Sequence, residues 1–207
     1  MTYDLISALA AFAFVTSITP GPNNLMLMAS GMNFGLRKTI PHMLGVGLGF
    51  VFMVLMVGLG LAQIFVAFPV SYRVLQVVSV VYLLYLAWRI ATVDASQGTE
   101  FSGEQTSKPI TFLQAALFQW VNPKAWAMAL TAVSAYTPPS QSVSSIFVVA
   151  LVFGIINLPA VSSWTLLGMQ MRLVLKNRSR QRLFNIVCAL LLILSLWPVL
   201  ADTPFFA

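Results

Sequence analysis

Two polar breaks interrupt long apolar stretches of this chain, and their residues could bind a small charged molecule. The first break is residues 19–24 and the second break is residues 119–124, which read Thr19, Pro20, Gly21, Pro22, Asn23, Asn24 and Gln119, Trp120, Val121, Asn122, Pro123, Lys124. A proline has no backbone N–H, so Pro20 and Pro22 would leave the carbonyls of Thr16 and Ile18 without helical partners. Such carbonyls can accept hydrogen bonds from an ammonium group.

The same breaks also offer positive charge. A helix that begins at Pro22 would point the N–H groups of its first turn, and the positive end of its dipole, at a carboxylate. The ammonium group of Lys124 would favour the same anion. The two breaks together therefore predict a binding site for an amino-acid zwitterion, whereas a single proline by itself is better explained as a packing kink.

Lys124 and Asn157 are polar residues deep within uncharged stretches. A charge at the centre of a bilayer costs about 2.5–3.5 kcal/mol, and no Asp or Glu lies in these stretches to pair with Lys124. We expect Lys124 to contact substrate or to take part in proton coupling, the alternative being a side chain that snorkels to the interface. Asn157 is predicted to bind substrate or to join helices. His42 is placed at the membrane interface, where it could carry protons or have no role.

The composition is that of a membrane protein. Hydrophobic residues make up 59% of the chain, charged residues 8%, and the mean hydropathy is +0.89, which excludes a soluble globular protein. The net charge of +6 does not indicate nucleic-acid binding, because the basic residues lie at the ends of apolar stretches. With Cys188 as the one cysteine, and no cluster of ligating residues around it, the sequence predicts no metal and no cofactor.

Six apolar stretches are each long enough to cross a bilayer. They are residues 5–33, 40–65, 71–91, 111–135, 143–171 and 183–201. A polar connection at 93–110 separates the first three from the last three. We therefore expect an all-α integral membrane protein that is one domain over residues 1–207, with six transmembrane helices in two three-helix repeats, about 1–92 and 111–207.

The basic residues predict how these helices are oriented. Nine of them lie in the first, third and fifth connections, namely Arg37, Lys38, Arg89, Lys108, Arg172, Lys176, Arg178, Arg180 and Arg182, whereas the second connection has only Arg73. Because Lys and Arg collect on the cytoplasmic side, the connection at 93–110 should be cytoplasmic and both termini should lie outside. An odd number of spans in each half makes the second repeat inverted, so that the broken first and fourth helices meet near the midplane.

Several of these residues resemble a known family. The first break, followed by Gly35, Leu36, Arg37, Lys38 and Gly45, and later by Asn122, Pro123 and Lys124, resembles the lysine-exporter and homoserine/threonine-efflux family (LysE/RhtB) of bacterial amino-acid exporters. Residues 108–112, 118–122 and 183–187 are similar to its branch that exports cysteine and O-acetylserine. The resemblance covers the whole chain and implies an inner-membrane carrier that works by proton antiport. Many members carry an acidic residue where this chain has Asn157, so no coupling role is carried over to Asn157.

Three classes of function can be compared on the residues alone. A secondary active transporter for amino acids, of the cysteine/O-acetylserine or homoserine/threonine type, explains the paired breaks. A membrane-embedded enzyme would need a nucleophile, a metal cluster or an acid–base pair that the apolar stretches lack. A non-transporting assembly subunit would need no polar site at the midplane. The sequence thus favours the transporter, with an amino-acid substrate and membrane lipid as its partners and self-association left open.

Overall fold

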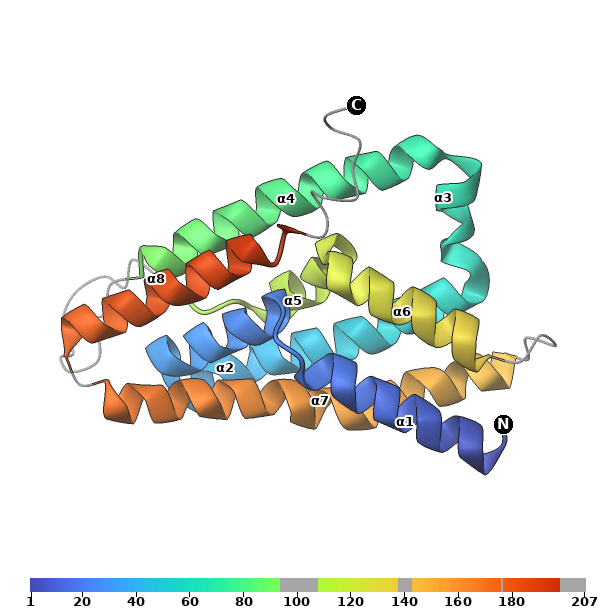
Figure 1. The fold of residues 1–207 in the computed structure, drawn as a ribbon, viewed down its shortest axis with the longest axis horizontal. Coiled ribbons are helices and arrows are strands. Elements are labelled where there is room, and N and C mark those ends of the chain that lie inside the picture. Colours follow the sequence, from blue (N-terminus) through green and yellow to red (C-terminus); the bar gives the residue numbers. More distant parts are fainter. Residues whose placement is uncertain (94–107, 138–142, 176, 198–207) are drawn as a thin grey trace.

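The computed structural model describes residues 1–93, 108–137, 143–175 and 177–197, which form helices and the turns between them (Figure 1). The helices are α1 (Tyr3–Ile18), α2 (Pro22–Met56), α3 (Gln63–Ala67), α4 (Pro69–Ala91), α5 (Phe112–Phe118), α6 (Pro123–Tyr136), α7 (Val143–Val174) and α8 (Arg178–Leu194). A π-helical segment, Val57–Leu61, joins α2 to α3, and a 3-10 turn, Gln119–Val121, lies between α5 and α6. No strand is found in the described ranges, which confirms the all-α prediction for them.

Both predicted helix breaks are present. Helix α1 ends at Ile18, Thr19 and Gly21 are extended, and α2 starts at Pro22, where a missing N–H costs nothing. In the second break, Asn122 is the N-cap of α6, and its side-chain oxygen accepts a hydrogen bond from the backbone N–H of Lys124 at 3.1 Å. Each break therefore ends one helix and starts another within a few residues.

Helix α2 reverses direction at Gly35. This residue has φ +77°, a left-handed conformation that glycine adopts without strain. The hydroxyl groups of Ser30 and Thr39 lie 3.0 Å apart, although nine residues of straight helix would separate them by about 13 Å. The chain therefore doubles back here, and we call residues 22–34 the first arm of α2 and residues 36–56 its second arm.

Glycines let the helices touch through their backbones. A Cβ atom at Gly168 of α7 would lie 2.0 Å from the carbonyl oxygen of Met28, in the first arm of α2. In the second arm, a Cβ at Gly45 would lie 2.4 Å from the carbonyl oxygen of Phe112, and one at Gly49 would lie 2.7 Å from the Cα of Ala116. Small residues thus allow close helix approach here, as they do in other membrane helix bundles.

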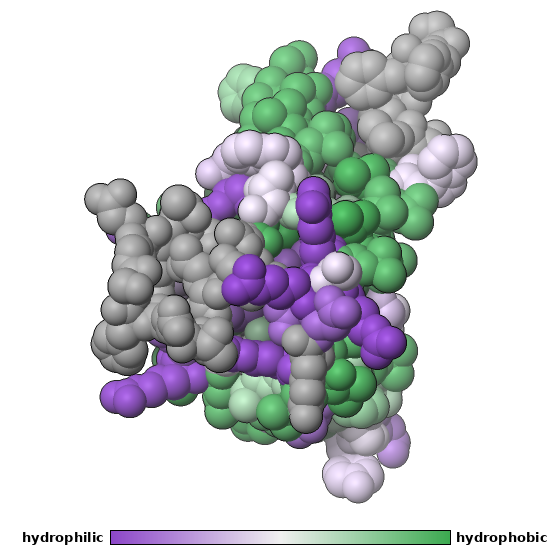
Figure 2. Space-filling view, turned by 90° about the vertical axis from the view of Figure 1, so that its left-hand side faces the viewer, coloured by the Kyte–Doolittle hydropathy of each residue, from purple (hydrophilic) through white to green (hydrophobic). Residues whose placement is uncertain are grey.

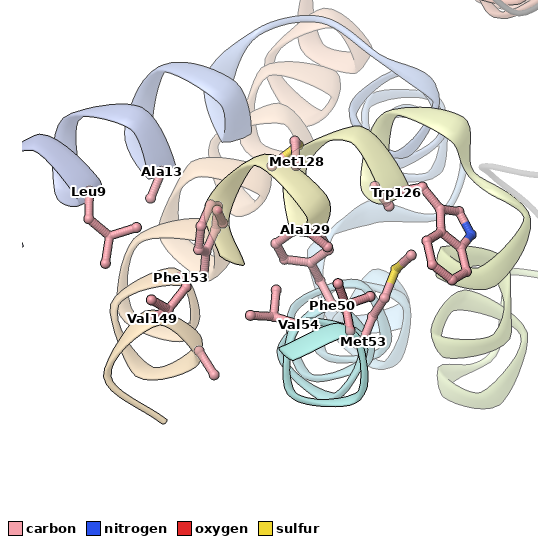
Figure 3. Packing of buried hydrophobic residues seen from close by; sticks show 14 residues of the cluster. Leu9, Ala13, Phe50, Met53, Val54, Trp126, Met128, Ala129, Val149 and Phe153 are labelled. Carbon is pink, nitrogen blue, oxygen red and sulfur yellow. The ribbon is translucent and has the colours of Figure 1, made fainter. Parts of the chain in front are cut away.

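Two apolar clusters lie on either side of the breaks. Figure 3 shows the first, in which Leu9 of α1, Phe50 of α2 and Phe153 of α7 pack together. The second joins α4 to α8 through Leu83 and Cys188, and this cysteine is buried as a packing residue. Together the clusters hold the broken helices in place.

Basic residues gather at one end of the molecule. The Gly35 turn, the C-terminal ends of α4 and α7 and the start of α8 all lie at the left of Figure 1, and Figure 2 shows hydrophilic residues concentrated on that face. We call it the basic end. Its exposed residues include Arg37, Lys38, Arg178, Arg180 and Arg182. The N-terminus, α3 and the start of α4 lie at the opposite end.

By length and apolar composition, three helical stretches of the described ranges could each cross a membrane: Pro22–Leu61, Pro69–Ala91 and Val143–Val174. The first contains 40 residues, which would measure about 60 Å as a straight helix, twice the thickness of the hydrocarbon core. Its reversal at Gly35 divides that length into two arms. The predicted connection at 93–110 and the turn after Tyr136 fall largely outside the described residues.

Candidate functional site

The two breaks, about one hundred residues apart in sequence, are in contact. The side-chain amide of Asn23 donates to Gln119 Oε1 at 2.8 Å, and Gln119 Nε2 donates back to Asn23 Oδ1 at 3.3 Å. Gln119 is completely buried and also donates to the carbonyl of Ala115. Two side-chain amides that satisfy each other in this way fix the register of the first break against the second.

Lys124 makes the second link between the breaks. Its Nζ donates to the carbonyl oxygen of Thr19 at 2.6 Å and lies 3.4 Å from that of Pro20. The lysine side chain runs over Gly21, where a Cβ atom would be only 2.6 Å from Lys124 Cδ, so glycine at this position makes room for it. The alternative of a snorkelling lysine is wrong, because the ammonium group is bound to the backbone of the first break.

Other carbonyls of the first break already have protein partners. Asn24 Nδ2 donates to the carbonyls of Ser17 at 2.9 Å and Thr19 at 2.8 Å. The carbonyl of Ile18, expected to be free for an ammonium group, accepts a hydrogen bond from Trp164 Nε1 at 3.1 Å. That expectation is wrong because Trp164 of α7 reaches across to the end of α1. The carbonyls that reach an ammonium group are those of Thr19 and Pro20.

Asn157 joins two helices and keeps one polar atom unused. Its Nδ2 donates to Ser17 Oγ at 3.0 Å, which ties α7 to α1. Its Oδ1 is buried and has no hydrogen-bond partner among the described residues. A buried acceptor without a partner is costly, so this oxygen is available to a donor that enters the site.

These groups surround a small polar cavity, which we call the central cavity. Its polar lining comes from Thr16, Ser17, Asn23, Asn24, Gln119, Asn122, Lys124 and Asn157, and its apolar lining from Gly21, Phe50, Ala125, Met128 and Val161. Its volume is about 20 Å³, and a single water molecule needs about 10–15 Å³ of such space. The cavity is thus mainly polar, is lined by α1, both arms of α2, the 3-10 turn, α6 and α7, and has room for about one water molecule.

Comparison with known proteins agrees with this architecture. The sequence pattern of the family described as LysE type translocator matches residues 14–195. The chain belongs to the LysE family. Over 194 residues it is 33% identical to the cysteine/O-acetylserine efflux protein of Escherichia coli O1:K1 / APEC, and 32% identical to the proteins so named in E. coli strain K12 and Shigella sonnei strain Ss046. Each alignment covers 93% of this chain and 96% of the relative. No solved structure matches the chain significantly.

The predicted family resemblance is therefore confirmed. Because LysE-family proteins are translocators, this chain is a membrane transporter and not an enzyme. The break residues that carried the resemblance are the ones that line or shape the central cavity of this LysE-family protein.

The ten residues predicted to bind substrate divide into two groups in the LysE-family structure. Those that line the central cavity are Gly21, Asn23, Asn24, Asn122, Lys124 and Asn157. The other four are Thr19, Pro20, Pro22 and Pro123, which shape the backbone of the breaks and whose side chains lie outside this cavity. The binding role of all ten stays a prediction.

The sequence argument missed Thr16 and Ser17 as lining residues, and it placed Gln119 in the second break without including it among the residues predicted to bind substrate. Thr16 and Ser17 form the last turn of α1 before the first break, and Gln119 opens the second break. Their position next to a break in the sequence was the signal that could have identified them. Polar residues in the helix turn before a break can face the cavity that the break forms. The apolar lining residues Phe50 and Val161 carried no signal, since their contact with the cavity depends on how helices pack.

His42 lies inside the protein. It is completely buried, and neither ring nitrogen has a hydrogen-bond partner among the described residues. It shares one face of the second arm of α2 with Thr39 and Val46, which are also buried. The sequence argument did not foresee this burial, because hydropathy does not show which face of the helix turns into the protein; a position at the depth of the membrane interface stays a prediction.

Proposed function

We propose that this LysE-family protein is a secondary active transporter that exports cysteine, O-acetylserine or a similarly small amino acid from the bacterial cytoplasm. The names of its relatives, aligned over nearly the whole chain, support the substrate class. Homoserine and threonine belong to the same class of small polar amino acids and are part of the proposal. The central cavity is the proposed substrate site.

The contact between Lys124 and Thr19 is the observation that carries this proposal. A primary ammonium group lies 2.6 Å from a carbonyl oxygen freed by the first break, which is the contact that the ammonium group of an amino acid would need. We infer that Lys124 occupies this position in the empty carrier. The substrate would place its own ammonium group on the Thr19 carbonyl and on Asn157 Oδ1, and Lys124 would turn to the substrate carboxylate.

This exchange keeps every charged group partnered. If Lys124 left Thr19 with nothing to replace it, a positive charge deep in the protein would lose its acceptor, which is costly. A zwitterion replaces the lost ammonium contact and brings a carboxylate to pair with the lysine. The central cavity has a volume of about 20 Å³ and must widen to admit an amino acid. Binding and conformational change are therefore coupled in this proposal.

We further propose that the chain is one domain of six spans in two inverted repeats, with α1 and the first arm of α2 forming one broken span and α5 with α6 forming the other. Figure 1 supports this, because the chain runs toward the basic end through α1 and away from it through α6. The proposed location is the bacterial inner membrane, with the basic end in the cytoplasm and both chain termini outside.

Proton antiport is the proposed driving reaction. The one acidic residue in the described ranges is Asp4, near the N-terminus, so no carboxylate there can serve as the coupling group inside the described helices. Among the Lys and His side chains of the described helices, Lys124 is half-buried at the central cavity and His42 is fully buried. We therefore assign coupling to one of these two residues.

Counterflow in proteoliposomes tests the proposed function. Purified protein is reconstituted with unlabelled amino acid inside, and entry of labelled cysteine, O-acetylserine, homoserine and threonine is measured one at a time. We expect counterflow of at least one of them, accelerated when the proton gradient opposes the amino-acid gradient. Absence of counterflow for the whole panel, from protein shown to be correctly folded, would favour the alternative of a non-transporting assembly subunit.

A further inference from the structure

A second and much larger cavity lies beside the two breaks, and we call it the side cavity. Its volume is about 530 Å³, within the range of about 300–1,000 Å³ that pockets for small ligands span. It lies between α4, α6 and the C-terminal end of α8. Helix α4 contributes Tyr72, Leu75, Gln76 and Ser79, which recur at the spacing of one helix face.

The lining of the side cavity mixes apolar and polar groups. Leu75, Trp126 and Leu130 are apolar walls, whereas Gln76 and Ser195 are polar. The side-chain amide of Gln76 makes no hydrogen bond within the described part of the chain. A gap that only holds lipid tails would leave such an amide unpaired in hydrocarbon, which is unfavourable. Water or a polar solute is therefore the better occupant.

The side cavity and the central cavity share a wall. Gly21 and Lys124 line both of them, and Gly21 has no side chain with which to close the passage. The lysine side chain, held to the carbonyl of Thr19, is thus the movable part of the barrier. Release of its hydrogen bonds to the carbonyls of Thr19 and Pro20 would free this side chain to move out of the wall.

The side cavity extends toward the end of the molecule that is opposite to the basic end. Tyr72 is in the first turn of α4, Leu130 is in the second half of α6, and Ser195 follows the last residue of α8. The basic end carries the C-terminal end of α4 and the start of α8 instead. Since basic residues mark the cytoplasmic side, the side cavity faces the outside.

We propose that the side cavity is an outer vestibule through which an amino acid leaves the protein, and that the Lys124 side chain is the latch between this vestibule and the central cavity. The identity of the solute rests on the proposed function. The carboxylate of a bound amino acid draws the Lys124 ammonium group away from Thr19. The latch therefore opens toward the outside only when substrate is present, which prevents an open path across the membrane.

Thiol accessibility tests the vestibule without any transport measurement. In a Cys188→Ala background, single cysteines are introduced as Gln76→Cys and Tyr72→Cys, with Val78→Cys as the matched control at an exposed position of α4 that does not line the side cavity. A charged, membrane-impermeant thiol reagent is added to the outside of intact cells. We expect Gln76→Cys and Tyr72→Cys to react at least tenfold faster than Val78→Cys. If neither reacts from outside, or if they react only in inside-out vesicles, the vestibule assignment is wrong.

A second pair of variants tests the latch. Ser17→Cys places a thiol in the central cavity, where the native lysine should shield it from the external reagent. Adding Lys124→Ala should raise its rate of reaction at least tenfold, whereas Lys124→Met, which keeps the bulk of the side chain, should raise it less. Gln76→Cys combined with Lys124→Ala controls for folding. An unchanged Ser17→Cys rate in Lys124→Ala protein whose Gln76→Cys counterpart still reacts would overturn the latch.

The two proposals fail separately. Outside labelling at Gln76→Cys without amino-acid counterflow would contradict the exporter and leave the outward cavity in place. Counterflow without outside labelling would support the exporter and remove the vestibule.

Discussion

Lys124 holds the two breaks together through a single side chain. Its ammonium group has no carboxylate near it in the described structure and is bound to the carbonyls of Thr19 and Pro20. Hydrogen bonds to a charged group contribute about 1.5–3 kcal/mol, more than those between neutral groups. These hydrogen bonds can therefore offset the cost of burying the Lys124 ammonium group. They can also be exchanged for contacts with a substrate, as a binding residue requires.

We expect Lys124→Met to insert into the membrane at least as well as the wild type, because a charge at depth is removed. Its affinity for substrate should fall roughly 10- to 100-fold, the equivalent of one lost charge-assisted hydrogen bond. Lys124→Arg should restore only part of the affinity, since a planar guanidinium group replaces a compact ammonium group. The measurement is efflux from preloaded vesicles, normalised to the amount of transporter. Wild-type efflux by Lys124→Met would contradict the proposed carboxylate contact.

At the scale of the elements, α7 is the helix against which the first arm of α2 is placed. Gly168 contacts the backbone of Met28, and Trp164 and Asn157 bond to Ile18 and Ser17 at the end of α1. Both sides of the first break are thus positioned by the same helix. An error in the packing of α7 should be transmitted to the central cavity.

Gly168→Ala tests this packing. The new Cβ would lie 2.0 Å from the carbonyl oxygen of Met28, and backbone cannot move aside as a flexible side chain can. We expect a loss of about 1–3 kcal/mol in stability, seen as a lower melting temperature of the purified protein in detergent, together with weaker substrate binding. Gly154→Ala is the matched control on the same helix, because its Cβ would be 3.1 Å from a terminal methyl group of Val51. Equal melting temperatures for the two variants would show that α7 can shift.

At the scale of the whole molecule, charge and cavities are arranged along one axis. The exposed residues Arg37, Lys38, Arg178, Arg180 and Arg182 lie at one end, and the side cavity extends toward the other. The central cavity lies between them and has a volume of only about 20 Å³. In the proposed orientation, the larger cavity is on the side to which an exporter would release its solute.

Reporter fusions test the orientation of this axis. A reporter that is active only in the cytoplasm should give signal when inserted near Lys38 or Arg178, at the basic end. It should be silent when inserted after Thr137, at the other end of α6. The expectation follows from the excess of basic residues on cytoplasmic loops. Signal after Thr137 together with silence at Arg178 would reverse the orientation, and with it the direction assigned to the side cavity.

The sequence by itself determined the class of protein, the positions of the breaks and the family. These properties are local: a window of apolar residues measures transfer into lipid, and a proline removes an N–H wherever it stands. The breaks after Ile18 and before Pro123 were accordingly placed correctly. The family pattern was also readable, because it consists of these same break residues.

Only the tertiary structure decided which groups meet. Trp164 and Ile18 are 146 residues apart, and Lys124 and Thr19 are 105 apart, so no local pattern links them. The burial of His42 and the side cavity likewise depend on which helix faces are turned toward each other. In a membrane, apolar residues suit lipid and protein neighbours alike, so hydropathy does not specify the packed face. The packed faces are specified by glycine contacts and by side-chain hydrogen bonds between helices that are far apart in the sequence.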